Sequence, residues 1–200
     1  MTLDRLRPVA NRLLDPFVAA ATGLGLTPDG VSVVAFAFAV AAGGAFYLAG
    51  PLAYLAGALF VFVNGWLDLL DGALAREQGA DSPAGDLLDH VLDRYADVVV
   101  IAGLAAGVGR YALGFFAVTG VLLTSYMGTQ IQAVGLGREY GGLVGRADRL
   151  ALIGLAGVLA AGAGLVGPWF APVEWLLAFF AVVGHLTALQ RFWGAWRDLS

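Results

Sequence analysis

The chain has 200 residues, of which 60% are hydrophobic and only 13% are charged, and its mean hydropathy is +0.80. A soluble domain carries about 25% charged residues, so this chain has too few polar side chains to cover an aqueous surface. The absence of cysteine excludes disulfides and thiolate metal sites, and the net charge of −4 argues against nucleic acid as a partner. We therefore expect an all-α integral membrane protein.

Residues 1–30 differ from the rest of the chain because arginines interrupt their apolar positions. Apolar side chains recur at spacings of three and four, at Leu3, Leu6, Ala10, Leu13, Leu14 and Phe17. This pattern predicts an interfacial amphipathic helix, bent or restarted near Pro8 and Pro16. A short soluble cap on the first span is the alternative. The expected organisation is a juxtamembrane segment at 1–30 and a membrane domain at 31–200.

The membrane domain contains apolar runs of a length that suits transmembrane helices, which take roughly 20 residues. Thr27 and Pro28 suit the start of the first run, as helix cap and first-turn residue, and the pair Gly50-Pro51 separates it from the second. Six transmembrane helices are expected, at residues 31–49, 52–67, 85–108, 111–134, 149–171 and 173–193.

The arginines predict how these helices are oriented. With six spans, ten of the eleven basic residues lie on the side that holds both termini, and only Arg110 lies on the other. Because cytoplasmic loops carry an excess of Arg and Lys, we expect a multi-pass protein of the cell membrane with both termini in the cytoplasm. The acidic residues described next lie on the same side.

Eight of the fifteen acidic residues lie between positions 68 and 97. Asp68 and Asp71 are three apart and so share one helix face, and Asp89 and Asp93 share a face of the next helix. The residues between them, 77–84, include glycine and proline and predict a reversal that pairs the two helices antiparallel. Four facing carboxylates cannot all ionise without cations, and oxygen ligands favour Mg²⁺ or Mn²⁺. Two such cations would clamp a diphosphate.

Small residues and an arginine accompany these carboxylates at fixed offsets. The pattern is Asp68-x-x-Asp71-Gly72-x-x-Ala75-Arg76, then eight residues, then Gly85-x-x-x-Asp89-x-x-x-Asp93. It resembles the signature of the CDP-alcohol phosphotransferase family, and every fixed position and gap matches. Eight specified residues are far more specific than a lone glycine motif.

The resemblance implies a membrane enzyme of phospholipid synthesis that joins a CDP-linked lipid to the hydroxyl of a polar alcohol, releases CMP and forms a homodimer. It implies two divalent cations, Mg²⁺ or Mn²⁺, and makes Asp93 the general base. The implied metal ligands are Asp68, Asp71, Asp89 and Asp93, and the implied CDP-binding residues are Gly72, Ala75, Arg76 and Gly85.

Three arginines, Arg138, Arg146 and Arg149, lie between the fourth and fifth spans. Residues 141–149 resemble a segment that binds the acceptor's phosphate in the branch of the family that uses phosphorylated polyols; general membrane anchoring is the alternative. Relatives that use inositol phosphate tend to carry a Lys-x-Arg pair upstream, whereas residues 128–132 contain no basic residue. We therefore expect glycerol phosphate as the acceptor, with inositol phosphate as the alternative.

Two more distant functions use similar carboxylates. An intramembrane prenyltransferase also pairs aspartate-rich helices with Mg²⁺, and Asn64 gives it slight support, but it needs more spans than 200 residues allow. A small cation transporter would need acidic residues along the whole path, whereas here they cluster at one end. Outside the motif, Asp97 is expected to pair with a nearby arginine, and Arg191 and Arg197 are expected to anchor the C-terminal end.

Overall fold

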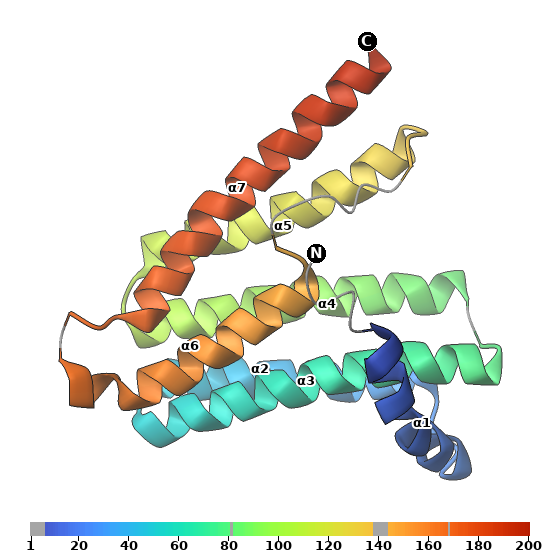
Figure 1. Ribbon diagram of the computed structural model, residues 1–200, viewed down its shortest axis with the longest axis horizontal. Coiled ribbons are helices and arrows are strands. Elements are labelled where there is room, and N and C mark those ends of the chain that lie inside the picture. Colours follow the sequence, from blue (N-terminus) through green and yellow to red (C-terminus); the bar gives the residue numbers. More distant parts are fainter. Residues whose placement is uncertain (1–6, 81, 138–143, 168) are drawn as a thin grey trace.

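The computed structural model describes residues 7–80, 82–137, 144–167 and 169–200. In this part of the chain the secondary structure is entirely helical (Figure 1). The helices are α1 (Arg7–Gly23), α2 (Pro28–Leu48), α3 (Pro51–Gln78), α4 (Pro83–Gly107), α5 (Tyr111–Ala133), α6 (Arg146–Val166) and α7 (Pro172–Leu199). The predicted all-α membrane fold is confirmed, with six long helices following a short N-terminal one.

Five of the long helices, α2, α3, α5, α6 and α7, are long and apolar enough to cross a membrane. The sixth, α4, has 25 residues, but its first half carries Asp86, Asp89, Asp93, Arg94 and Asp97. The length of α4 therefore lies within the range of the other five helices, and α4 differs from them in carrying more charged residues. The charged half of α4 belongs to the candidate site, and the apolar half, from Val98 onward, packs in the core.

In three helices, α3, α6 and α7, one end differs from the prediction by five residues or more; α7 continues to Leu199, six residues past its predicted end. The helix α3 continues to Gln78, well past residue 67. Asp68 and Asp71 contact other helices, whereas the last turn is exposed. The helix ends where Gly79 adopts a left-handed conformation with φ of 58°. The helix α6 begins at Arg146, three residues before the predicted start, and ends at Val166. At its start the Asp148 carboxylate accepts a hydrogen bond from the Gly145 amide, at 3.0 Å, which caps the helix.

The N-terminal helix α1 runs continuously across Pro16 rather than restarting there. Its inner face packs against Leu70 and Leu74 of α3, and the buried residues of that face are Leu14, Val18 and Ala21. Leu13 points outward with an exposed fraction of 58%, and Phe17, 49% exposed, packs its ring edge-on against Trp66 of α3. One face therefore braces the end of α3, and the other presents apolar side chains as an interfacial helix does. Figure 1 shows α1 lying across that end of α3.

The helix α2 lies between the two helices that carry the acidic motif. It packs against both α3 and α4, whereas α3 and α4 make few direct contacts in the described residues. The predicted reversal brings the carboxylates of α3 and α4 together, but the two helices face each other across a pocket that α2 and α6 also line, rather than packing directly. The approach of α2 to α4 is close: a Cβ added at Gly103 would overlap the backbone of Gly43. Small residues permit such packing of membrane helices.

The remaining helices form a second group. The helices α5 and α7 pack extensively against each other and lean away from α2, α3, α4 and α6 (Figure 1). A Cβ at Gly184 of α7 would lie only 2.5 Å from the carbonyl carbon of Gly120 in α5, so this pair also depends on glycine. The candidate site lies at the end of the bundle where α3 ends and α4 and α6 begin.

Candidate metal and nucleotide site

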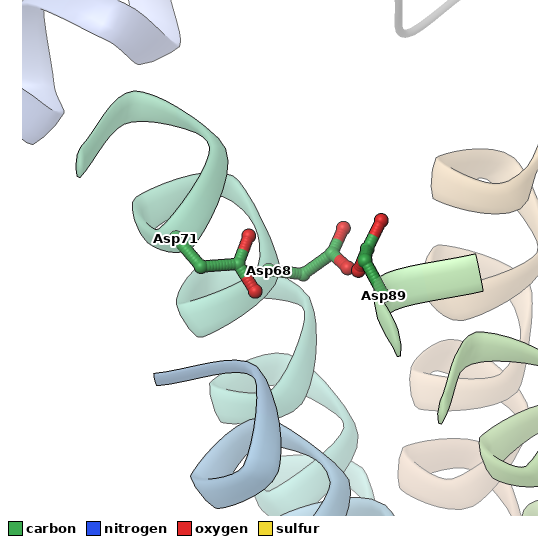
Figure 2. A group of neighbouring side chains, drawn as sticks. All are labelled: Asp68, Asp71 and Asp89. Atoms are coloured by element: carbon green, nitrogen blue, oxygen red, sulfur yellow. The ribbon is translucent and has the colours of Figure 1, made fainter. Parts of the chain in front are cut away.

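Three carboxylates of the motif converge between α3 and α4. Asp68, Asp71 and Asp89 each offer an oxygen, and these oxygens lie within 4.8 Å of one another (Figure 2). Two oxygens on opposite sides of a Mg²⁺ ion, at about 2.1 Å each, lie about 4.2 Å apart, so small rotations of the side chains suffice for binding. Asp93 lines the same pocket, one turn after Asp89. The donor set of carboxylate oxygens fits a hard divalent cation.

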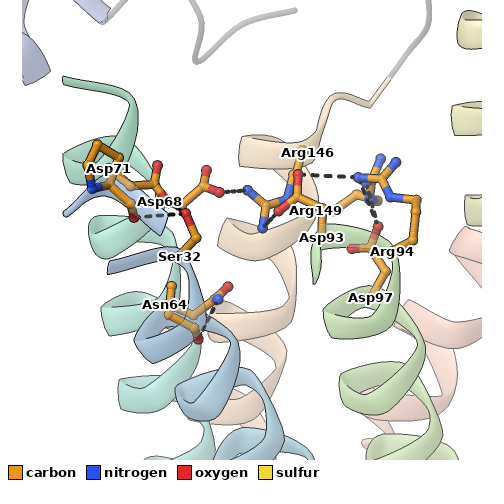
Figure 3. Close-up of polar contacts among 11 residues, drawn as sticks. Ser32, Asn64, Asp68, Asp71, Asp93, Arg94, Asp97, Arg146 and Arg149 are labelled. Atoms are coloured by element: carbon orange, nitrogen blue, oxygen red, sulfur yellow. Dashed lines mark hydrogen bonds and ion pairs between the residues drawn. The ribbon is translucent and has the colours of Figure 1, made fainter. Parts of the chain in front are cut away.

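Arg146 joins the helices that carry these carboxylates. From the first turn of α6, its guanidinium forms ion pairs with Asp68 of α3 and with Asp93 of α4 (Figure 3). Its Nε atom is buried and has no hydrogen-bond partner in the described residues. A positive charge in this place reduces the repulsion among the carboxylates. A cation bound by Asp68 would compete with this guanidinium for the same oxygens.

Arg149 lies one turn further along α6, and its charge is paired within the protein. Its Nη2 atom donates to Asp97 of α4 at 3.0 Å, and both side chains are buried. Arg94 lies 3.6 Å from the same Asp97 carboxylate. The expected pairing of Asp97 with a nearby arginine is confirmed. The candidate acceptor arginines therefore differ: Arg146 lies among the motif carboxylates, Arg149 is held in an internal ion pair, and Arg138 lies outside the described residues.

We expect Asp97→Ala to destabilise the protein strongly. Removing one partner of a buried ion pair leaves an uncompensated charge and costs about 3–5 kcal/mol, here at Arg149. The thermal unfolding of the detergent-purified variant should therefore begin at a markedly lower temperature. Adding Arg149→Met should restore much of the loss, and Asp198→Ala at the exposed C-terminal end is the matched control. An unchanged unfolding temperature in Asp97→Ala would contradict the ion pair.

The candidate CDP-binding residues line the open side of α3 and the start of α4. A Cβ at Gly72 would meet only the Arg76 guanidinium, at 3.6 Å. At Gly85 it would lie 3.2 Å from an Asp29 carboxylate oxygen of α2, while the Gly85 amide donates to the Ser82 hydroxyl that caps α4. The backbone is thus open at Gly72, whereas Gly85 is closely surrounded by the side-chain oxygens of Asp29 and Ser82. The predicted set of Gly72, Ala75, Arg76 and Gly85 lies on these two helices.

Two polar side chains of the pocket were missed or misread in the sequence. Ser32 of α2 donates to an Asp71 carboxylate oxygen at 2.6 Å (Figure 3); as a single hydroxyl in an apolar run it gave no signal. Asn64 supports no prenyltransferase here, because its side-chain amide donates to the Ala35 carbonyl of α2 at 2.9 Å and so joins two helices.

The predicted surface anchor Arg191 instead reaches into the fold. Its Nη1 atom donates to the Thr124 carbonyl of α5 at 2.6 Å. A second small pocket lies between α5, α7 and the start of α6, and its lining includes Thr124, Arg149 and Thr187. Arg197, two turns later, is exposed as expected.

Known proteins resemble this chain over almost its whole length. A sequence model of the family described as CDP-alcohol phosphatidyltransferase matches residues 25–186. The archaetidylinositol phosphate synthase of Methanothermobacter thermautotrophicus is 34% identical over 199 residues, which cover 99% of this chain and 96% of that protein.

Two of the solved structures that are similar to this chain are of the same enzyme, the phosphatidylinositol phosphate synthase of Mycobacterium tuberculosis. The structure with CDP-DAG bound is 27% identical, with a TM-score of 0.78 over 92% of this chain and 94% of that one. The complex with manganese and citrate has a TM-score of 0.79 and covers 88% of that chain. Divalent metals thus accompany this fold, and the cluster of Asp68, Asp71 and Asp89 has the ligands to hold one.

These comparisons overturn the expectation of glycerol phosphate as the acceptor, because the similar proteins are inositol phosphate synthases. The absence of a basic pair at residues 128–132 was a weak discriminator. An arginine elsewhere in the chain, such as Arg146, also offers a charge-assisted fork for a phosphate, so the absence of one basic pair does not exclude a phosphorylated acceptor. The matches also exclude the prenyltransferase and transporter alternatives.

Proposed function

Because the chain belongs to the CDP-alcohol phosphatidyltransferase family, we propose that it transfers a lipid-phosphate group from a CDP-lipid to a hydroxyl of inositol phosphate, releasing CMP. The observation that carries this proposal is the position of Arg146. Its guanidinium contacts Asp93 and Asp68, so a phosphorylated alcohol held by Arg146 would lie beside the last carboxylate of the motif. The names of the similar proteins support inositol phosphate as that alcohol.

In the proposed reaction Asp93 acts as the general base. It accepts the proton of the acceptor hydroxyl while the hydroxyl oxygen forms a bond to the lipid-bearing phosphorus of the diphosphate. The bond from that phosphorus to the bridging oxygen breaks, and the oxygen leaves with CMP. Arg146 orients the acceptor by holding its phosphate with a charge-assisted fork.

The other carboxylates bind and orient the donor in this scheme. Asp68, Asp71 and Asp89 would hold the divalent cations, which supply charge neutralisation to the diphosphate. Gly72 leaves room for the nucleotide beside the backbone of α3, and the lipid chains remain in the bilayer. The arginine distribution supports a cytoplasmic site, and the family resemblance supports a homodimer.

A panel of acceptors tests the proposal. Detergent-purified protein is given Mg²⁺ or Mn²⁺, a CDP-lipid with either diacylglycerol or archaeol, and one of four acceptors: inositol phosphate, glycerol phosphate, serine or inositol. We expect CMP release with inositol phosphate and little with the others, since the other three lack either its phosphate or its ring. Preferential use of glycerol phosphate or of free inositol would contradict the proposed acceptor.

A further inference from the structure

Polar contacts join one face of α3 to α2 and to the residues just before α2. They involve α3 positions 64, 71 and 78, which are seven residues apart and therefore two turns apart on one face. The contacts are Asn64 Nδ2 to Ala35 O at 2.9 Å, Ser32 Oγ to Asp71 Oδ2 at 2.6 Å, and Gln78 Nε2 to Leu26 O at 3.0 Å. The outer two end on backbone carbonyls, and only the middle one ends on a carboxylate of the candidate metal site.

The hydroxyl of Ser32 has one proton and two acceptors within reach. It lies 2.6 Å from Asp71 Oδ2 and 3.2 Å from the Pro28 carbonyl of its own helix. A distance of about 2.5–2.7 Å is typical of a hydroxyl that donates to a carboxylate. The proton therefore belongs to the Asp71 contact, which is the stronger of the two.

Asp71 depends on such a neighbour more than the other carboxylates do. Only 6% of its surface is exposed, whereas Asp68 and Asp89 are half-buried. Arg146 forms ion pairs with Asp68 and Asp93, while Ser32 donates to Asp71. A buried carboxylate held by a hydrogen bond has one preferred rotation, and here that rotation directs it toward Asp68 and Asp89 (Figure 2).

We infer that Ser32 is a positioning residue, which orients the Asp71 carboxylate for metal binding. The inference rests on the proposed role of Asp71 as a metal ligand. The backbone of Ser32 is held firmly, because α2 packs against both α3 and α4. Further along α2, Gly43 lies in close contact with Gly103 of α4. Partners that orient a metal ligand typically contribute 10–100-fold to metal affinity.

The test measures metal affinity rather than turnover. Mn²⁺ is titrated into detergent-purified protein without substrates, and free Mn²⁺ is followed by electron paramagnetic resonance. We expect Ser32→Ala to weaken Mn²⁺ binding about 10–100-fold and Ser32→Thr, which keeps the hydroxyl, to bind nearly as wild type. Gln78→Ala is the matched control, because it removes an outer contact of the same face without touching Asp71; its Mn²⁺ affinity should not change.

Three results would overturn the inference. The first is wild-type Mn²⁺ affinity in Ser32→Ala, and the second is a loss of Mn²⁺ affinity in Ser32→Thr as large as in Ser32→Ala. The third is an equal loss of Mn²⁺ affinity in Gln78→Ala, which would indicate that α2 has loosened from α3 in general. Asp71→Ala separates this inference from the proposed function. If Asp71→Ala binds Mn²⁺ as wild type, the metal-ligand role itself fails. If Asp71→Ala loses binding and Ser32→Ala does not, only the role of Ser32 fails.

Discussion

Asp93→Asn is expected to lower kcat by about 10²–10⁴-fold, the usual contribution of a general base. The amide has the size of the carboxylate but does not accept the proton of the acceptor hydroxyl. Asp68 still pairs with Arg146 in this variant, so the helix arrangement and the binding of CDP-lipid should persist. Turnover is measured as CMP release at saturating substrates, and donor binding by calorimetry.

The control for Asp93→Asn is Asp86→Asn. Asp86 lies two turns earlier on α4, is exposed and is not part of the motif, so its variant should turn over as wild type. Near-wild-type kcat in Asp93→Asn would rule out Asp93 as the base. A large loss of donor affinity in the same variant would instead make Asp93 chiefly a metal ligand.

Arg146→Ala should raise the KM for inositol phosphate about tenfold to a hundredfold. A hydrogen bond to a charged group contributes about 1.5–3 kcal/mol, and 1.4 kcal/mol corresponds to a factor of ten. The KM for CDP-lipid should change little, because the cations and not Arg146 hold the diphosphate in the proposed site. Arg146→Lys keeps the charge but loses the planar fork, so it should show a partial defect.

The structure adds a second measurement for Arg146. Since its guanidinium contacts Asp68 and Asp93, removing it frees carboxylate oxygens for cations, and the Mn²⁺ affinity of Arg146→Ala should not fall. Arg197→Ala, at an exposed position near the C-terminal end, is the control and should alter neither KM. Equal small effects at both positions would favour an unphosphorylated acceptor.

Composition and local spacing were enough to predict the class of protein and the acidic residues of the site. The low content of charge required a membrane environment, since apolar helices have no other way to be solvated. Local rules also sufficed for many helix ends: Thr27 accepts a hydrogen bond from the Gly30 amide, and Pro28 follows it in the first turn. The helical repeat placed Asp68 and Asp71 on one face, because neighbours along a helix depend only on sequence spacing.

The contacts between residues far apart in the sequence could not be predicted from local spacing. Ser32 and Asp71 are 39 residues apart, and Asp97 and Arg149 are 52 apart; no local rule brings either pair together. The close packing of α2 against α4 rests on glycine contacts such as Gly43 with Gly103, which depend on how whole helix surfaces fit. The partners of Arg146 and Arg149 likewise depend on the angle at which α6 meets the motif helices. Arginines of equal charge, three residues apart, therefore have different surroundings: one lies among the motif carboxylates and the other is sealed against Asp97.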